Sequence, residues 1–413
     1  MAALLITYED VLKGLDEAHL LLGNGFNASL GIMTDYKSIF NEMKNGYSGY
    51  QDIENLFESN EYDLEKLLGE LEGNLKTPGG FLNRFVSNKI KLDFMKAASH
   101  LAASQVNNVY QEKNDGIYLL LKNFNNYFTL NYDPFLYLLM MKFKKKDNKN
   151  GAVILQGALP FIEDDLDEEQ NGIYSKIKEA RNNGELSIHV NKNDTRKELS
   201  QCTKSTFNTV VKEHFKAENW KAKDIDKAIN LVWQEENESH ELNINDGFFK
   251  DKDFEQPVYK GKQMLNQNLF FLHGAFHIYQ NKDTIFKITQ KSDKALYERL
   301  TEIINNGEEN IVCVFKSDEK KEEIEANTYL ASAYKKLAEL SGSIVLIGCS
   351  LSDNDNHVFE QINKSKVDTI YISSKEKNKD EDYSKAKKIF SKKEIILFDR
   401  ETITYELPNN ENE

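Results

Sequence analysis

Short apolar runs that end in polar or small residues are the feature of this sequence that most restricts its fold. Several are rich in β-branched residues and show little alternation with polar ones, which is typical of strands covered on both faces of a parallel sheet. Segments with apolar residues at three- and four-residue spacing lie between them and predict helices. Strands that alternate with helices indicate an α/β fold with right-handed crossovers. The apolar runs cover residues 19–23, 126–133, 268–274, 310–315, 343–350, 368–374 and 394–399.

The middle of the chain differs from the two ends. It is polar and charged, contains apolar stripes such as IDKAINLVWQE, and is too long for a loop in a compact domain. It therefore predicts a mainly helical insertion between two parts of one core. The first part, the insertion and the second part with the tail are expected at residues 1–142, 143–267 and 268–413. Within the core, helices are expected over residues 62–75, 81–106 and 323–342, the last ending at Gly342 as its C-cap.

The composition of the chain argues against several kinds of partner and cofactor. The 413 residues include 53 Lys and Arg but 67 Asp and Glu, a formal net charge of −14, which disfavours nonspecific binding to nucleic acid or to an anionic membrane. The three cysteines, Cys202, Cys313 and Cys349, form no C-x-x-C pair, so no structural zinc or other metal is expected. The first residues do not resemble a signal peptide, and no apolar stretch would span a bilayer. We expect a cytoplasmic protein.

The first stretch that could bind a ligand is HLLLGNGFNASLGI, residues 19–32. An apolar strand ends at Gly23, and the second glycine, Gly25, opens a helix. In this arrangement backbone N–H groups can bind a phosphate, and the side chains of Asn24 and Asn27 can add hydrogen bonds without charge repulsion. The alternative is a strand–turn–helix connection that needs glycine only for its backbone conformation.

The second and third stretches also follow predicted strands. In FTLNYDP, the side chains of Thr129, Asn131 and Asp133 alternate along a strand end and would point the same way, into a ligand crevice. The alternative is an ordinary Asn–Asp–Pro turn. In FLHGAFHIY, His273 comes at a strand end, and no other histidine has a comparable setting in the sequence. His277 lies four residues on, without the acidic partner of a zinc motif.

The fourth stretch is IVLIGCSLSDNDNHVF, residues 344–359. A strand ends in Gly348, Cys349 and Ser350, whose backbone and hydroxyl groups could bind a ribose or a phosphate. Acidic and amide residues then lead into a predicted helix that begins near His357. The alternative is that this polar segment only caps the helix, with Asp355 as the N-cap.

Taken in chain order, the four stretches resemble the NAD-binding core of sirtuins, and more specifically the bacterial sirtuin-like NAD hydrolases of antiphage defence. The sirtuin loop G-A-G-x-S-x-x-S-G-I corresponds to GNGFNASLGI at 23–32. The sirtuin T-Q-N-x-D, His-Gly and G-T-S-L segments correspond to TLNYD, FLHG and GCSL at 129–133, 271–274 and 348–351. The resemblance covers about 15–135 and 265–375. It implies a Rossmann-like parallel sheet that binds NAD⁺.

The resemblance also implies roles for individual residues. Asn131 would hold the nicotinamide ribose and help to position water, and Asp133 would bind the carboxamide. His273 would be the general base, with a pKa near neutrality. The pyrophosphate would lie against Gly23, Asn24, Gly25 and Phe26. Asn27 and Thr129 would contribute polar contacts in the same crevice. The adenosine-side ribose and the adenine would lie near Gly348, Cys349, Ser350 and Ser373.

Two departures from deacetylating sirtuins define the expected reaction. The four-cysteine zinc module is missing, and so is the arginine that follows the Gly-Ile pair, since Tyr36 lies near that place. Binding of an acyl-lysine peptide is therefore not expected. With water as acceptor, NAD⁺ is the substrate and the products are nicotinamide and ADP-ribose.

The resemblance further implies a gated NAD⁺ glycohydrolase that depletes NAD⁺ in antiviral, abortive-infection defence. An alternative is a regulatory subunit that binds NAD or ADP-ribose without catalysis, and a third is an ADP-ribosyl or acyl-lysine transferase. Such systems imply a homo-oligomer and a partner subunit, for which a HerA-type hexameric ATPase is the preferred expectation. Direct binding of nucleic acid or membrane is not expected.

Overall fold

The computed structural model forms two compact units, Met1–Phe161 with Leu242–Glu413, and Ile162–Glu241. Each unit is described by itself below. The residues that the structure describes are 4–73, 80–143, 168–186, 188–189, 196–197, 204–237, 242–249, 251–254, 256–261, 266–288, 296–306, 309–314 and 320–405.

A seven-stranded sheet forms the centre of the larger unit, and every pair of neighbouring strands in it is parallel. This sheet, flanked by helices, confirms the predicted α/β, Rossmann-like fold. The short edge strand β1 is the one member that the apolar runs did not predict. In spatial order the strands are β1 (Leu5–Ile6), β14 (Glu394–Asp399), β13 (Lys366–Ser374), β12 (Ser341–Ile347), β2 (Ala18–Leu22), β3 (Asn126–Thr129) and β8 (Leu269–Phe271).

The strand order reverses between β2 and β12. From β2 the chain moves outward to β3 and β8, then returns to β12 on the other side of β2 and continues to β13 and β14. Ligands of open α/β sheets bind at such a reversal, beyond the carboxyl ends of the strands. Leu20, Leu21 and Leu22 of β2 are fully buried, as expected for the central strand of a sheet covered on both faces.

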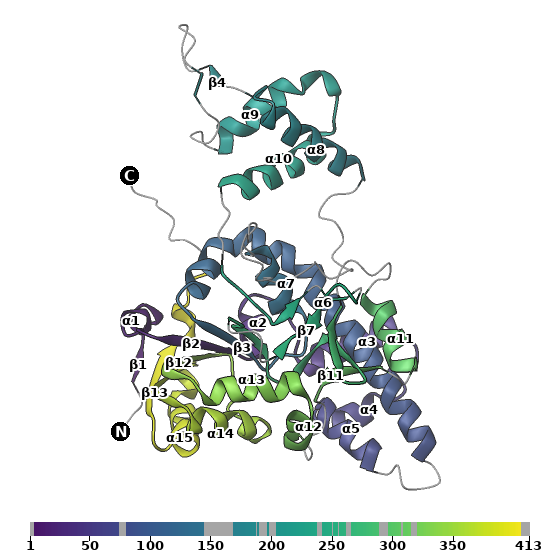
Figure 1. The fold of residues 1–413 in the computed structure, drawn as a ribbon, viewed down its shortest axis with the longest axis vertical. Coiled ribbons are helices and arrows are strands. Elements are labelled where there is room, and N and C mark those ends of the chain that lie inside the picture. The colour runs from purple at the N-terminus through teal and green to yellow at the C-terminus, as the bar shows by residue number, and fades with distance from the viewer. Residues whose placement is uncertain are drawn as a thin grey trace. The chain divides into compact units, whose positions relative to one another are not determined.

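Helices cover both faces of this sheet (Figure 1). One side carries α12 (Lys320–Ala326), α13 (Thr328–Ala338), α14 (Asn356–Lys364) and α15 (Lys379–Ile389). The segment between β2 and β3 contains α2 (Asn24–Ser29), α3 (Tyr36–Gly46), α4 (Glu54–Ser59), α5 (Leu64–Gly73) and the 42-residue α6 (Gly80–Leu121). The remaining helices of this unit are α1 (Tyr8–Lys13), α7 (Phe135–Lys142) and α11 (Leu296–Asn306).

The helix predicted over residues 323–342 is interrupted. Asn327 caps α13, because its side-chain oxygen accepts hydrogen bonds from the N–H groups of Tyr329 and Leu330. The prediction that Gly342 is a helix C-cap was wrong, since α13 ends at Ala338 and Gly342 lies in β12. Gly342 has φ +74°, and the register of β12 against β13 shifts just after it. A bulge at the start of a strand therefore explains this glycine.

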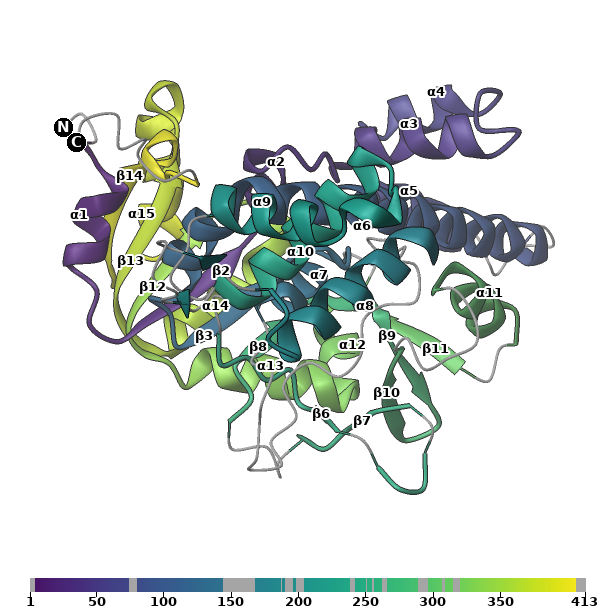
Figure 2. The same ribbon diagram turned by 90° about the horizontal axis from the view of Figure 1, so that it is seen from above.

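A second, antiparallel sheet has five strands, of which two precede β8 in the chain and three follow it (Figure 2). The run at 310–315 does form a strand, but it pairs antiparallel with β9 in this sheet and not with the parallel strands. Periodicity cannot distinguish the two cases, because short apolar runs occur in both kinds of sheet. In spatial order the strands are β11 (Glu309–Cys313), β9 (Gly274–Asn281), β10 (Thr284–Lys287), β7 (Val258–Tyr259) and β6 (Phe248–Phe249).

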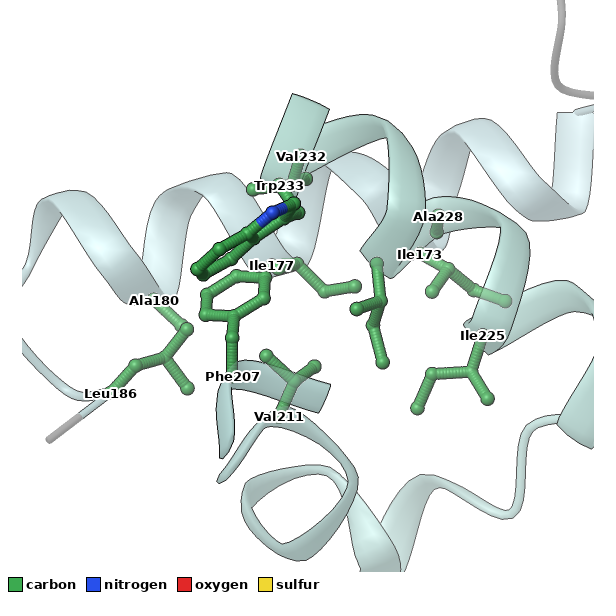
Figure 3. Packing of buried hydrophobic residues seen from close by; sticks show 11 residues of the cluster. Ile173, Ile177, Ala180, Leu186, Phe207, Val211, Ile225, Ala228, Val232 and Trp233 are labelled. Atoms are coloured by element: carbon green, nitrogen blue, oxygen red, sulfur yellow. The ribbon is translucent and has the colours of Figure 1, made fainter. Parts of the chain in front are cut away.

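The described residues of the smaller unit are mainly helical, and this unit, Ile162–Glu241, covers fewer residues than the insertion expected at 143–267. Residues 242–267, which contain β6 and β7, belong to the larger unit. The smaller unit has its own apolar core, in which the rings of Phe207 and Trp233 lie 5.4 Å apart (Figure 3). Its described elements are α8 (Glu168–Asn182), α9 (Lys204–His214), a 3₁₀ turn η2 (Lys216–Glu218), α10 (Ala222–Asn237), β4 (Ile188–His189) and β5 (Arg196–Lys197).

Candidate functional site

A cavity of about 720 Å³ lies at the carboxyl edge of the parallel sheet, where the strand order reverses. Its volume is in the range of pockets that hold small molecules and cofactors. Ten of the thirteen predicted site residues line it, and they come from the ends of β2, β3, β8, β12 and β13. The ten are Gly23, Asn24, Gly25, Asn131, Asp133, His273, Gly348, Cys349, Ser350 and Ser373.

His273 occupies the turn that leads from β8 of the parallel sheet into β9 of the antiparallel one. The turn requires the following glycine, because Gly274 has φ +81° and a Cβ there would lie 1.8 Å from the carbonyl oxygen of Val312. The imidazole is 3% exposed, and its Nδ1 lies 3.2 Å from the carbonyl oxygen of Leu130. A carbonyl only accepts hydrogen bonds, so this contact places a proton on Nδ1.

The protonation state of His273 differs from the prediction. A pKa near neutrality was expected, and this was wrong: burial, with Lys320 and His357 nearby, holds the pKa of His273 well below its usual value of 6.5. The imidazole is therefore neutral at physiological pH. With the proton on Nδ1, its Nε2 carries the lone pair and can accept a proton from a ligand or from water.

A second histidine faces this lone pair. His357, near the start of α14, has its Nε2 3.1 Å from Nε2 of His273, and the two rings stack with centroids 5.1 Å apart. Burial lowers the pKa of His357 to about 4, so both rings are neutral, and one hydrogen bond joins the two Nε2 atoms. The expectation that no other histidine has a comparable setting was therefore wrong. The signal was present in the sequence, since His357 follows the predicted strand 343–350 in a polar segment.

Asp355 lies beside this pair of histidines. It holds the N-cap position of α14, but its side chain makes no capping hydrogen bond, so the capping alternative does not describe its carboxylate. Its Oδ1 lies 3.6 Å from Nε2 of His273. Burial raises the pKa of Asp355 to about 6, although Lys320 opposes the rise. The cavity wall therefore carries an acid that ionises close to neutral pH, beside the candidate base.

Behind the histidines lies a buried ion pair that the sequence did not indicate. Nζ of Lys320, at the start of α12, lies 2.7 Å from Oε2 of Glu65 on α5, and the two side chains are 4% and 6% exposed. The hydroxyl of Tyr132 lies 2.8 Å from the other carboxylate oxygen of Glu65. Glu65 and Tyr132 line the cavity. Their partners come from distant parts of the chain, so no local pattern could have identified the pair.

Asp133 is held by a chain of polar side chains. Asn27 donates from Nδ2 to Asp133 Oδ2 at 3.0 Å and to Thr34 Oγ1 at 2.9 Å, and Thr34 donates in turn to Asn24 Oδ1 at 2.7 Å. Asn27 is fully buried and does not line the cavity, so the structure places it as a positioning residue for Asp133. Burial raises the pKa of Asp133 to about 6, against the lowering effect of its hydrogen bonds from Phe135 N–H and Asn27.

Thr129 does not share the direction of Asn131 and Asp133. Strand β3 ends at Thr129, so the period-two alternation expected through Asp133 does not apply beyond that residue. Thr129 is fully buried, and its Oγ1 accepts a hydrogen bond of 3.1 Å from the N–H of Asn131. It thus holds the backbone from which Asn131, half-buried, reaches the cavity.

The glycines after β2 and β12 pack against each other. A Cβ on Gly23 would lie 2.4 Å from the carbonyl oxygen of Gly348, and one on Gly348, with φ +69°, would lie 2.2 Å from the nitrogen of Phe26. The N–H of Gly25 donates to Gly348 O, and that of Phe26 donates to Gly23 O. Phe26 itself is fully buried. Close contact of two loops therefore explains these glycines, and the N–H groups of Gly25 and Phe26 are already bonded within the protein.

The residues expected to lie near the adenosine also line the cavity. Ser373, at the end of β13, accepts a hydrogen bond of 3.0 Å from the N–H of Gly348 and so holds the loop after β12. Burial raises the pKa of Cys349 above its ordinary value, so this residue is a neutral thiol. Ser350 is exposed at the rim. The three residues Gly348, Cys349 and Ser350 thus form one side of the cavity.

Further features of the described residues concern metals and membranes. No group of three His, Cys, Asp or Glu side chains in the described ranges is arranged to hold a metal ion. Likewise, among the helices described here none is long and apolar enough to cross a bilayer. Cys313 and Cys349 are free thiols, and Cys202 lies outside the described residues.

Comparison with known proteins adds a partial match. A family model described as a domain of unknown function, DUF4917, matches residues 229–404. The matched segment contains His273, Asp355 and His357, but it begins after Gly23 and Asn131. Curated proteins give no significant match to the chain. Any assignment of function therefore depends on the chemistry of the cavity and on the sequence motifs that line it.

Proposed function

We propose that the protein is an NAD⁺ glycohydrolase, which cleaves the nicotinamide–ribose bond with water to give nicotinamide and ADP-ribose. The observation that carries this proposal is that Asn131 and His273, from separate strand ends, line one cavity with the glycine loops after β2 and β12. The four motifs that resemble the sirtuin NAD-binding core meet at that cavity. Binding alone would not require a buried, neutral imidazole beside the predicted ribose site.

The proposed reaction needs little acid catalysis. When the bond from C1′ of the ribose to the nicotinamide nitrogen breaks, the electron pair leaves with nicotinamide, which is then neutral. The ribose becomes cationic, and water adds its oxygen to C1′. The neutral Nε2 of His273 accepts the proton released by that water, and the amide of Asn131 orients the ribose and the water.

The carboxylates supply the charge that such a transition state requires. Asp355, whose Oδ1 lies 3.6 Å from His273 Nε2, is negative above about pH 6 and stabilises the imidazolium that forms when His273 takes the proton. Asp133 is held rigidly by Asn27 and faces the nicotinamide side of the cavity. The ring of His357 is hydrogen-bonded to the same Nε2 and must move away before that atom can accept the proton of water.

That contact between the histidines favours one alternative function. If His357 holds His273 permanently, the cavity binds NAD or ADP-ribose without cleaving it, and the chain acts as a regulatory subunit. In the glycohydrolase, displacement of His357 by the substrate or by a partner is instead the step that permits catalysis. We place the enzyme in the cytoplasm, in gated antiphage defence, as a homo-oligomer with a partner subunit such as a HerA-type hexameric ATPase.

The decisive test is incubation of the full chain with NAD⁺, alone and with the product of the neighbouring gene. We expect nicotinamide and ADP-ribose to appear in equal amounts by chromatography, with no label transferred from radiolabelled NAD⁺ to protein. Stoichiometric binding of NAD⁺ without release of nicotinamide in either mixture would contradict hydrolysis and support the regulatory subunit. Label on protein would instead support a transferase.

The two carboxyls near the base predict the pH dependence of hydrolysis. Asp133 and Asp355, each with a pKa of about 6, lose their charge as the pH falls, whereas His273 stays neutral to lower pH. We therefore expect kcat/KM to be constant above about pH 7 and to fall below about pH 6. Asp355→Asn should lower kcat/KM at pH 8 and make the acid side of the profile less steep. An acid side that is unchanged in both Asp355→Asn and Asp133→Asn would contradict this assignment.

A further inference from the structure

Four cationic side chains gather at the end of the cavity farthest from His273. Lys375 follows β13 directly, Lys377 lies in the next turn, Lys385 is on α15, and Arg400 follows β14. The chain as a whole carries a net charge of −14, so this concentration of positive charge is local. The four side chains lie near the carboxyl ends of β13 and β14, on the far side of the glycine loops from β8.

In the described part of the chain, most of these cations have no carboxylate partner. Lys385 pairs with Glu381 at 2.7 Å, and the other nearby acid, Asp382, accepts a 2.5 Å hydrogen bond from the Ser374 hydroxyl. Within the described residues no carboxylate forms an ion pair with Lys375, Lys377 or Arg400. Among the described residues that line this end of the cavity, four cations therefore face two acids, Glu381 and Asp382.

The position of these cations in the cavity corresponds to the adenosine end of a bound dinucleotide. The strands β8, β3, β2, β12 and β13 are successive neighbours, so four strand spacings of about 4.8 Å, roughly 19 Å in all, separate the His273 end from the Lys375 end. A dinucleotide places its pyrophosphate at the reversal between β2 and β12, which are the third and fourth of these five strands. With nicotinamide at His273, the adenosine ribose then lies at the end of β13.

At that position the protein's charge decides which dinucleotide is bound. In Rossmann-type dinucleotide sites, an acidic side chain at the adenosine ribose binds the free 2′-hydroxyl of NAD⁺, whereas an arginine nearby accommodates a 2′-phosphate. Here β13 is followed by Lys375, and the guanidinium of Arg400 can bind a phosphate through two parallel hydrogen bonds. We infer that this end of the cavity binds a 2′-phosphate, so that the substrate class of the proposed glycohydrolase is NADP⁺ in preference to NAD⁺. The inference rests on the proposed function for the orientation of the dinucleotide.

The test measures binding of adenosine fragments to the full chain by titration calorimetry, so it needs no turnover. Adenosine 2′,5′-bisphosphate should bind at least tenfold more tightly than 5′-AMP, and the difference should shrink as salt is added. Lys375→Gln and Arg400→Gln should each remove most of that difference while leaving the affinity for 5′-AMP unchanged, which also shows that the variants fold. Lys388→Gln, on α15 but outside the cavity lining, is the matched control and should bind both fragments as the unaltered chain does.

Three results would overturn the inference. The first is equal affinity for 5′-AMP and adenosine 2′,5′-bisphosphate. The second is equal or tighter binding of the 3′,5′-isomer, which would assign the cations to a different phosphorylated ligand. The third is a preference for the bisphosphate that survives both Lys375→Gln and Arg400→Gln. Failure of the proposed function is distinguishable, because a chain that binds the 2′-phosphate tightly but releases no nicotinamide from NADP⁺ or NAD⁺ would contradict hydrolysis and still confirm the subsite.

Discussion

Replacing His273 with alanine is expected to lower kcat for nicotinamide release at least about 100-fold, the effect of losing a positioned general base. The neutral Nε2 of this residue is the group that accepts the proton of water in the proposed reaction. Asn131→Ala should cause a comparable loss, because the ribose and the water are no longer held in a reactive orientation. Both variants should be assayed at saturating dinucleotide by chromatographic measurement of nicotinamide.

The chain offers a matched control for the loss of a buried imidazole. His19 is 1% exposed, but it lies at the start of β2, at the opposite edge of the sheet, where its Nε2 is 3.0 Å from the carbonyl oxygen of Ser341. His19→Ala should lower the stability and keep kcat within a few-fold of the unaltered chain. If His273→Ala and Asn131→Ala both retain turnover within about tenfold, the cavity is not the site of hydrolysis.

His357→Gln distinguishes the two functions that the histidine contact allows. If His357 restrains the base, its removal should raise the basal rate of nicotinamide release, and His273→Ala should abolish that rate in the double variant. The basal rate of nicotinamide release should therefore be higher in His357→Gln than in the unaltered chain, and lower in His273→Ala than in either.

The sequence predicted the parts of this protein that depend on local patterns. Six of the seven parallel strands correspond to apolar runs, since a strand buried on both faces must be apolar along its whole length. Their order placed His273 and Asn131 at the carboxyl edge, because polar residues after parallel strands meet there. The strand at 310–315 was also predicted, but its antiparallel pairing depends on β9 and is not encoded in its own residues.

The remainder of the site depends on contacts between segments that are distant in the chain. His357 and Asp355 looked like a helix-capping segment, and only the packing of α14 beside the β8–β9 turn brings them to His273. Gly23 was assigned to the pyrophosphate and Gly348 to the adenosine-side ribose, but the contact between the two glycines was not predicted. Propensity and spacing describe one segment at a time, so they do not predict contacts between distant segments.

Removal of the Lys320 ammonium should have the largest effect on stability, because Lys320 and Glu65 form a buried ion pair. The pair costs free energy to desolvate, and the loss of one member leaves the other as an unpaired buried charge. Lys320→Met is therefore expected to lower the free energy of unfolding by about 3–5 kcal/mol. Both tryptophans of the chain, Trp220 and Trp233, lie in the smaller unit, so the effect must be followed by far-ultraviolet circular dichroism in urea and not by tryptophan fluorescence.

Two further variants separate buried charge from lost packing. In Lys320→Met with Glu65→Gln the unpaired charge is gone, so most of the stability should return, since the glutamine oxygen can still accept from Tyr132. Lys385→Met breaks an ion pair of the same 2.7 Å length, but Lys385 and Glu381 are 48% and 69% exposed, and water solvates the remaining charge. That variant should unfold at nearly the same urea concentration as the unaltered chain. Equal losses in Lys320→Met and Lys385→Met, or no recovery in the double variant, would mean that burial of the charge is not what couples α5 to α12.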